Sequence, residues 1–403
     1  SAELFPTGVL PIFLRYNGIL VGTSSGICLF VRMEPFRSVK KMLTVRWYSG
    51  TLLRCRSKRF GKTAYVFTPI RYNPAIRGYV NTVTNTIPTT FNERKVSHTI
   101  IGGMQYRGQN KPEDFCVIVL NRGRKYYRPF FFEQLLAEGF TSVISIESSP
   151  DAGDMESLTT KFPQVRFLLP QEKLTVGEMI NLGFAETVAP YIMVLWNDTR
   201  IPPGSFTDRV LEKIKEAHLL CAAPVLANVR GEAVPNQMVP GLSGNRFSTE
   251  QFSCIKNKTA TIYPYDFMGI YSRNKCMQLG GFDYTIQNPY WQNLDFGFRA
   301  HLWGEAIRIF TSFRIHYEGE TPPENISTDA SYRQFYLKNL APELTGGSAV
   351  IPFKLFWRYL RNSGLNPLHA WQHFSEARRW VELNKDRFTT TARALIEHWE
   401  PFI

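Results

Sequence analysis

Polar and charged side chains that could form a ligand site follow three short apolar runs of this 403-residue chain. Those that come directly after a run are Asn121, Arg122, Glu147, Asn197 and Asp198. If the runs are strands of one parallel sheet, these side chains lie at carboxyl ends of strands, where ligands of such sheets bind. Arg122, with Arg124 and Lys125 beside it, has the charge to neutralise a phosphate, and surface solvation is the alternative for each of these cations. The pattern therefore predicts a ligand site at the strand ends.

The elements that would position these residues alternate between strands and helices. Continuous apolar runs predict strands over 115–120, 141–146 and 191–195, because strands of a parallel sheet are buried on both faces. Helices are expected over 130–138 and 176–187, between the strands. This alternation predicts an α/β fold with a Rossmann-like central sheet flanked by helices.

A second ordered set of motifs lies further along the chain. An apolar strand over 267–271 leads to a GGFD turn at 280–283, and a helix over 292–302 follows and carries Asp295 and Arg299. Together with the upstream strands, this order resembles the GT-A glycosyltransferases of family 2 over about half of the chain. The resemblance implies a mixed GT-A sheet. It also implies transfer of a sugar from a nucleotide-diphosphate donor to an acceptor hydroxyl, with inversion at the sugar carbon.

The resemblance also implies roles for individual residues. Glu147, at the end of its strand, would hold the base of the donor nucleotide. Asp283, with the glycine and phenylalanine before it, would lie at the mouth shared by donor sugar and acceptor. The residues expected to bind the rest of the donor are Asn121, Arg122, Asn197, Gly281 and Phe282.

In the resembled family an acidic motif holds a divalent ion against the donor diphosphate, and Trp196, Asn197 and Asp198 occupy that place here. Only Asp198 keeps the acid, and His316 fits the description of the family's further ligand. A carboxylate, an imidazole and phosphate oxygens suit a hard cation such as Mn²⁺ or Mg²⁺. The resemblance therefore predicts a divalent metal, weakly bound because one acid is missing. The alternative for Asp198 is a turn or helix-capping residue ahead of Pro202.

The general base of the resembled family is an acid at the position that Asn293 occupies, and an amide cannot accept the proton. Asp295 lies two residues further on, four residues before Arg299, a spacing that allows an ion pair within a helix. Such a pair would keep Asp295 ionised but would weaken it as a base, so a catalytic and a structural role both stay open. Asp283 is the second candidate for the base.

Two other functions fit the same elements. A sugar nucleotidyltransferase would need a glycine-rich basic loop after the first strand, and the segment NRGRK at 121–125 is a faint version of one. A sugar-nucleotide-binding protein without catalytic activity is favoured by Trp196, Gln292 and Asn293, which stand where the resembled family carries acids.

The net charge of +13 is concentrated in the first part of the chain. Residues 1–110 carry 16 Lys and Arg against three acids, whereas the rest carries 31 of each sign. This asymmetry marks a domain boundary near residue 112, and strand-like runs before it predict a basic, β-rich domain over 1–111. The resemblance implies a GT-A domain over 112–318, which leaves a helical region over 319–403. The basic domain suits an anionic glycan, lipid-linked or protein acceptor, or a membrane surface, with a solvated sheet face as the alternative. Nucleic acid is disfavoured, because no RNA-binding signature accompanies the charge.

Composition limits where the protein works. Hydrophobic residues make up 44% of the chain, yet no apolar run reaches the ~18 residues of a membrane span. The six cysteines are scattered, which predicts free thiols in a reducing cytoplasm. The aromatic segment 353–360 suits a helix that packs on the sheet or lies in a membrane interface. We therefore expect a cytoplasmic protein, with contact to the inner face of a membrane as an open alternative.

Overall fold

A computed structural model describes residues 94–103, 114–122, 127–147, 152–243, 246–254 and 256–399, together with the backbone of six earlier strands. The chain divides into two compact units, Ser1–Val83 and Thr84–Ile403. In the first unit β1 to β4 form an antiparallel sheet, and β5 pairs with β6. Their bounds are Phe13–Arg15, Gly18–Gly22, Cys28–Arg32, Thr44–Tyr48, Leu52–Arg56 and Thr63–Phe67. The basic side chains of this unit, and Arg124 and Lys125, lie outside the described residues.

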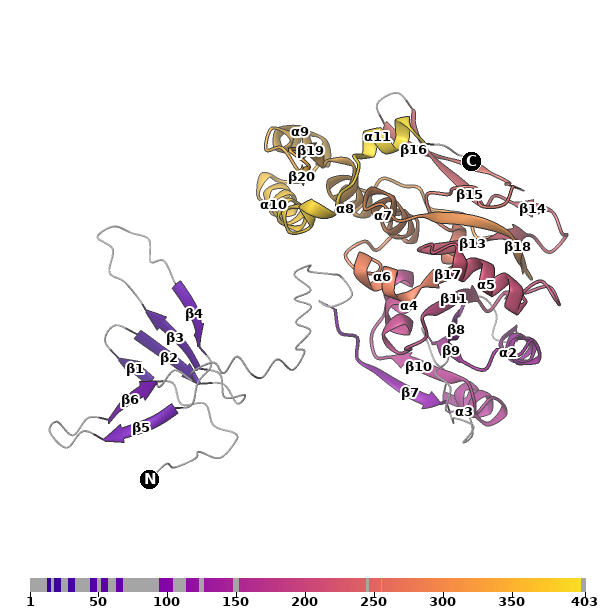
Figure 1. Ribbon diagram of the computed structural model, residues 1–403, viewed down its shortest axis with the longest axis horizontal. Helices are drawn as coiled ribbons and strands as arrows, with labels where there is room; N and C mark the ends of the chain where they lie inside the picture. The colour runs from indigo at the N-terminus through magenta and orange to yellow at the C-terminus, as the bar shows by residue number, and fades with distance from the viewer. Residues whose placement is uncertain are drawn as a thin grey trace. The chain divides into compact units, whose positions relative to one another are not determined.

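The second unit is built on a ten-stranded mixed sheet, seen in Figure 1. Its strands are β7 (His98–Gly102), β8 (Phe115–Leu120), β9 (Val143–Ile146), β10 (Arg166–Pro170), β11 (Tyr191–Trp196), β12 (Thr199–Arg200), β13 (Cys221–Ala227), β14 (Ala233–Val234), β17 (Gly269–Ser272) and β18 (Ile307–Tyr317). The spatial order is β12-β18-β13-β17-β11-β8-β9-β10-β7, and β14 pairs with β13. A separate hairpin joins β15 (Gln237–Ser243) to β16 (Arg246–Phe252).

The sheet has a parallel half and a mixed half. Strands β10, β9, β8 and β11 run parallel, whereas β17 lies antiparallel between β11 and β13. The parallel strands are the three apolar runs of the sequence together with β10, and their buried side chains form the core on both faces. The predicted α/β fold with a central mixed sheet is therefore confirmed.

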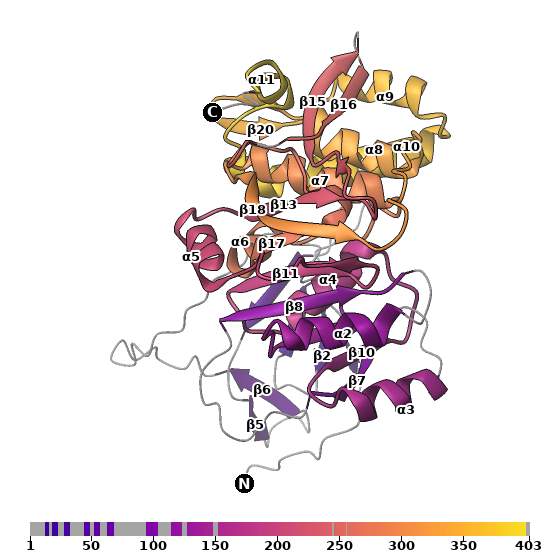
Figure 2. The ribbon, with the colours of Figure 1, turned by 90° about the vertical axis from the view of Figure 1, so that its right-hand side faces the viewer.

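Helices cover the faces of this sheet, as Figure 2 shows. They are α2 (Tyr127–Ala137), α3 (Ala152–Lys161), α4 (Val176–Ala185), α5 (Asp208–Glu216), α6 (Arg273–Leu279) and α7 (Pro289–Leu302), with the short turn η1 at Tyr265–Phe267. Helix α4 begins with a capping box, in which Thr175 and Glu178 each bond the other's backbone N–H. Helix α7 begins at Pro289 after the capping side chain of Asn288, a favourable pair at a helix start.

The edge strand β7 was expected to belong to the basic domain, and the structure places it in the large sheet. It pairs antiparallel with β10 from His98 opposite Pro170 to Gly102 opposite Arg166. Its side chains are mostly exposed, so it lacks the apolar run that reveals the inner strands. The charge of residues 1–110 placed this strand in the basic domain, because composition does not reveal which strands pair with one another.

The C-terminal region packs against α7 within the same unit. Phe335 contacts Trp291 and Phe298 of α7, with ring centroids 5.3 and 5.6 Å apart. The region contains α8 (Ala330–Phe335), the π-helical turn η2 (Tyr336–Leu340), β19 (Glu343–Thr345), β20 (Ser348–Val350), α9 (Leu355–Ser363), α10 (Pro367–Asn384), η3 (Lys385–Arg387) and α11 (Ala392–Glu397). Helix α9 buries Phe356 against α10 but leaves Trp357 66% exposed.

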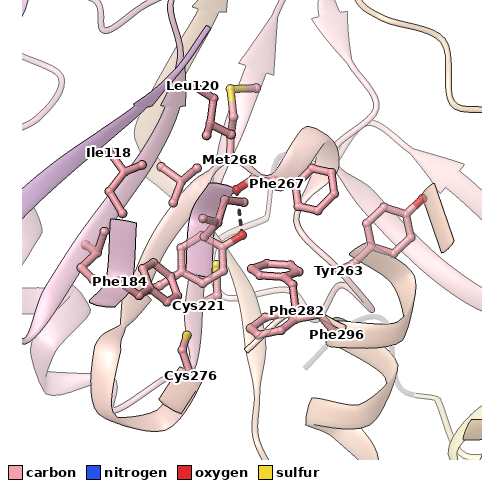
Figure 3. Close-up of a cluster of buried hydrophobic side chains, with 14 of the residues drawn as sticks. Ile118, Leu120, Phe184, Cys221, Tyr263, Phe267, Met268, Cys276, Phe282 and Phe296 are labelled. Atoms are coloured by element: carbon pink, nitrogen blue, oxygen red, sulfur yellow. Dashed lines mark hydrogen bonds between the residues drawn. The ribbon is translucent and has the colours of Figure 1, made fainter. Parts of the chain in front are cut away.

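Aromatic side chains fill the core beneath α7, shown in Figure 3. Phe282 stacks on Phe296 at 4.2 Å, and the Tyr271 hydroxyl donates to the carbonyl of Phe267 at 2.7 Å. Cys221, Cys254 and Cys276 are buried thiols in the described part of the chain. No helix in the described part of the chain is long and apolar enough to cross a membrane.

Candidate active site

A cleft of about 250 Å³ opens where β8 and β11 end, beside the first turn of α7. The loop that follows β18 closes its other side through Pro322–Asn325. The polar and aromatic side chains of its lining include Arg122, Trp196, Asp266, Tyr290, Asn293 and Glu324. The cleft therefore lies at the carboxyl ends of parallel strands, where the sequence predicted a ligand site.

Arg122 bridges two carboxylates at this edge of the sheet. Its Nε donates to Asp198 Oδ2 at 2.9 Å, and its Nη1 and Nη2 donate to the two oxygens of Asp266 at 2.8 and 2.6 Å. The guanidinium also lies over the Trp196 ring, 4.1 Å from the centroid. Burial works against its charge, but the two carboxylates outweigh burial and raise the pKa of Arg122. One permanent cation thus faces two acids.

Asp266 is held by an unusual backbone. It has φ +54° and Phe267 has φ +63°, so two consecutive residues other than glycine adopt the left-handed region. Trp196 Nε1 donates to the Asp266 carbonyl at 2.9 Å, and the Tyr317 hydroxyl donates to Asp266 Oδ2 at 3.0 Å. Burial raises the pKa of Asp266 although Arg122 opposes the shift. Strained backbone of this kind persists where surrounding contacts fix it, and it concentrates at functional sites.

The structure does not bring Asp198 and His316 together as metal ligands. His316 precedes Tyr317 on β18, and adjacent strand residues face opposite sides of the sheet. Tyr317 points to Asp266, so His316 points away from the cluster, and burial and the cations Arg200 and Arg314 lower its pKa.

The cluster also fails a test of fit for a divalent ion. The guanidinium of Arg122 occupies the carboxylate oxygens that a metal would take. Among the described residues, no group of three His, Cys, Asp or Glu side chains could hold a metal. Of the two side chains expected as metal ligands, Asp198 thus belongs to an Asp–Arg–Asp cluster with Arg122 and Asp266, and His316 does not.

Glu147 and Asn121 lie together at the ends of β9 and β8. Glu147 is 2% exposed and accepts from Arg128 and from Ser145 Oγ, the latter at 2.8 Å. Asn121 Nδ2 donates to the Ile146 carbonyl at 2.9 Å, which leaves Asn121 Oδ1 buried without a hydrogen-bond partner in the described chain. Among the described residues here, the acceptor without a partner is thus Asn121 Oδ1, while the Glu147 carboxylate is bound to Arg128.

The GGFD turn is a structural element of the core. Gly280 and Gly281 have φ +92° and +67°, which end α6 and turn the chain at low steric cost. Phe282 is fully buried, and Asn181 bonds both its N–H and its carbonyl. Asp283 is 2% exposed and forms an ion pair with Lys338. Burial would raise the pKa of Asp283, but Lys338 outweighs it and lowers that pKa.

Asp295 is also placed in the core. The ion pair with Arg299 that the spacing suggested is present, with Oδ2 and Nη2 2.8 Å apart. Its other oxygen, Oδ1, accepts from Asn339 Nδ2 at 2.7 Å, and the residue has no exposed surface. Both expected bases, Asp283 and Asp295, are thus buried carboxylates with charged partners, and neither lines the cleft.

Two polar groups in the cleft were not anticipated in these roles. Asn293 Nδ2 donates to the Pro264 carbonyl at 2.7 Å, and Asn293 Oδ1 is a buried acceptor with no partner in the described part of the chain. Glu324, on the loop after β18, accepts from the Tyr263 hydroxyl at 2.9 Å and from Gln251 Nε2 at 2.7 Å. Burial raises the pKa of Glu324 to about 7.

Sequence reasoning missed Asp266 and Glu324 for a common reason. Each lies in a short segment that contains proline and shows no strand or helix periodicity, YPYDF for Asp266 and TPPEN for Glu324. An acid directly before the predicted strand at 267–271 was the available signal for Asp266. Glu324 carried no comparable signal.

No protein-family model and no curated protein sequence matches this chain. Among solved structures, it is similar to GalNAc-T7 with UDP, GalNAc and Mn²⁺, with a TM-score of 0.53 and 10% identity, over 82% of this chain and 66% of that one. The chain has the GT-A glycosyltransferase fold. A Pyrobaculum calidifontis mannosyltransferase with GDP-Man and Mn²⁺ also matches, with a TM-score of 0.39 and 10% identity, over 72% of this chain and 76% of that one. TarS from S. aureus matches with a TM-score of 0.39 and 14% identity, over 71% and 45%.

Proposed function

We propose that this protein transfers a sugar from a nucleotide-diphosphate donor to an acceptor hydroxyl. The observation that carries the proposal is the cleft at the carboxyl ends of β8 and β11. It combines the Arg122 cation, the Asn293 amide oxygen, which has no hydrogen-bond partner among the described residues, and the Glu324 carboxyl group with a pKa near neutrality. Perturbed titratable groups in a cleft are characteristic of catalytic sites.

Arg122 is the residue that we assign to the donor diphosphate. It is the cationic side chain among the described residues that line the cleft. Its partner Asp198 is partly exposed, with 15% of the side chain accessible, so a phosphate oxygen can replace that carboxylate on Nε. The two-pronged contact with Asp266 would hold the guanidinium in place during this exchange. Donor binding is then independent of a divalent ion.

Glu324 is the residue that we propose as general base. Its pKa of about 7 leaves a large fraction ionised near neutral pH, and an ideal base titrates near the working pH. Asn293 Oδ1, across the same cleft, is an acceptor suited to orienting a substrate hydroxyl. A base that deprotonates the attacking hydroxyl favours a single displacement, and hence inversion at the sugar carbon.

A panel of UDP- and GDP-sugars tests the proposal, beginning with UDP-hexoses because GalNAc-T7 carries UDP and GalNAc. Thermal unfolding reports binding, since a ligand at 100 times its Kd stabilises the native state by ~2.7 kcal/mol. Release of free nucleotide reports turnover, and each measurement is made with Mn²⁺ and with a chelator. Stabilisation without any release would favour a binding protein. Release of pyrophosphate from a sugar phosphate and a nucleoside triphosphate would favour a nucleotidyltransferase.

A further inference from the structure

A second cavity lies between α8, η2 and α9 and encloses about 620 Å³. Its lining includes two arginines and three tyrosines, and no acid is among the described residues that line it. These arginines and tyrosines are Tyr332, Arg333, Tyr336, Arg358 and Tyr359. We refer to it as the arginine–tyrosine pocket.

Arg333, which lines this pocket, carries a donor without a partner among the described residues. Its Nη1 makes a long contact of 3.5 Å with the Ser363 carbonyl, and its Nε is buried with no hydrogen-bond partner in the described chain. The nearest acid in sequence on this helix is Asp329, whose Oδ1 caps α8 by accepting from the backbone of Ser331 and Tyr332. A buried guanidinium N–H without an acceptor costs free energy that a ligand oxygen would recover.

Tyr359 supplies a second unsatisfied group. It is 5% exposed, and its hydroxyl is buried without a hydrogen-bond partner in the described part of the chain. Burial raises the pKa of Tyr359 while the neighbouring cation Arg333 opposes the shift, so the phenol is protonated and free to donate. Arg358, one residue earlier, is exposed and adds a second positive charge at the rim. Two orphaned donors and two cations together match an oxyanion.

The remaining surfaces of the pocket suit a sugar ring. Tyr332 and Tyr336 lie one helical turn apart with ring centroids 6.3 Å apart, and aromatic faces pack against the apolar faces of ligands. Asn362 and Thr328 add amide and hydroxyl groups to the lining. Thr328 belongs to the loop after β18, whose residues Pro322–Asn325 also border the cleft. One loop therefore contacts both cavities.

We propose that the arginine–tyrosine pocket binds a phosphate-bearing carbohydrate, as part of the acceptor. The acceptor role rests on the proposed transferase function, whereas the binding site itself does not. Arg333 Nε and the Tyr359 hydroxyl donate to the phosphate oxygens, Arg358 supplies further charge, and the two tyrosine rings contact the sugar. The phosphate group is the shared chemistry, and a soluble sugar phosphate and a lipid-linked one both present it.

Calorimetric titration of the full chain with glucose 6-phosphate, glucose and inorganic phosphate tests the proposal. We expect glucose 6-phosphate to bind more tightly than either of the others. Arg358→Ala and Arg333→Gln should each weaken this binding about tenfold, the loss expected for a charge-assisted hydrogen bond. Arg361→Ala, an exposed arginine on α9 outside the pocket lining, is the matched control and should bind as the wild type does.

UDP titrated into the same variants separates this site from the cleft, since its affinity should be unchanged in all of them. Failure of UDP binding in the wild type would count against the proposed function and leave the pocket assignment standing. Wild-type affinity for glucose 6-phosphate in Arg358→Ala would overturn the assignment, and so would the absence of glucose 6-phosphate binding to the wild-type chain. Equal affinity for inorganic phosphate and glucose 6-phosphate would show that the pocket recognises phosphate alone, and it would overturn the carbohydrate part of the assignment. Arg358 is exposed, so its variant keeps the test valid if Arg333→Gln misfolds.

Discussion

Arg122 decides how the charges of the cleft are balanced. Asp198 and Asp266 would repel a donor diphosphate, and the guanidinium between them removes most of that repulsion. A fixed cation held by two acids and stacked on Trp196 is also pre-organised, so little side-chain freedom is lost when a ligand binds.

Replacing Arg122 should free the carboxylates of Asp198 and Asp266 to bind another cation. Arg122→Ala leaves two carboxylates without their counter-charge, which we expect to cost about 3 kcal/mol of unfolding free energy. The freed oxygens then suit a hard divalent cation, so Mn²⁺ should raise the Tm of the variant and leave that of the wild type unchanged. Arg200→Ala, which breaks the exposed ion pair with Glu318, is the control. An equal Mn²⁺ response in wild type and variant would contradict the assignment.

Glu324 gives the pH dependence. With its carboxylate as the proposed base, wild-type turnover should rise as pH increases through about 7, the pKa of Glu324. Glu324→Gln should lose at least ~100-fold in turnover and lose this rising limb, with donor affinity unchanged. Glu320→Gln, an exposed acid on the same loop, is the control. A variant that keeps full turnover would move the base elsewhere.

The raised pKa of Glu324 should also make the unfolding free energy depend on pH. The folded pKa is raised from the ordinary 4.5 to about 7, so the stability that the protonated carboxyl contributes is complete below pH 4.5 and is lost as pH rises through about 7. Glu324→Gln carries no proton to lose and should show a shallower decline of unfolding free energy over that window, measured by denaturant titration at several pH values. An identical pH profile in both proteins would show that Glu324 is not buried enough to matter.

Asp295 is expected to act on stability. Asp295→Asn leaves the buried Arg299 without its ion-pair partner, and we expect a loss of about 3–5 kcal/mol. Turnover per folded molecule should stay close to wild type, measured at a temperature where both proteins are folded. A selective loss of turnover in a stable protein would restore Asp295 as the base.

The contrast between these residues shows what sequence spacing can reveal. Asp295 and Arg299 are four residues apart in one helix, so local geometry alone predicts their contact. Arg122 and Asp266 are 144 positions apart, and their contact depends on how β8 and η1 meet in the folded sheet. Arg122 could therefore be identified as a candidate from its place at a strand end, while its acidic partner Asp266 could not.

At the scale of elements, the α4–α7 contact positions the first turn of α7 beside the cleft. Gly177 at the start of α4 donates its N–H to Gln292 Oε1 at 2.8 Å, and Gln292 Nε2 reaches Thr175 Oγ1 at 2.9 Å. A side chain on Gly177 would lie 2.4 Å from Phe282 Cβ, so only glycine allows this approach. Gln292 is thus a structural bridge between two helices.

Gly177→Ala should destabilise the protein by about 1–3 kcal/mol, because the added methyl group overpacks a rigid contact. The variant should also weaken donor binding, since it displaces the turn that carries Asn293. Gly319→Ala is the control, because a methyl group there meets nothing within 4 Å. Thermal unfolding and UDP titration measure the two effects, and unchanged stability would show that the helices can separate freely.

Element prediction succeeded where burial leaves a pattern. The runs at 115–120 and 191–195 are buried on both faces, and β8 and β11 coincide with them to within one residue. Helix α7 begins at Pro289, three residues before the predicted start, because the Asn288 cap was not taken into account. Strand β7 was missed because an exposed edge strand needs no apolar run.

At the scale of the whole molecule, the two compact units can be tested by truncation. A chain beginning at Thr84 retains every strand of the large sheet, so we expect it to unfold with nearly the wild-type Tm and to bind UDP normally. A chain beginning at Lys111 lacks β7 and exposes the edge of β10, so its Tm should fall and its tendency to aggregate should rise. Equal Tm values for the two truncations would show that β7 contributes nothing to the sheet. Impaired UDP binding by the chain that begins at Thr84 would instead show that the first unit, Ser1–Val83, contributes to donor binding.

The guanidinium of Arg122 affects how the protein would respond to the concentration of free metal in the cell. A metal that comes and goes has an occupancy set by its free concentration, whereas a cation built into the polypeptide is present in every folded copy. If Arg122 serves the donor diphosphate, chelators and manganese starvation leave this positive charge in place. The charge that faces the donor would then be the same at every concentration of metal.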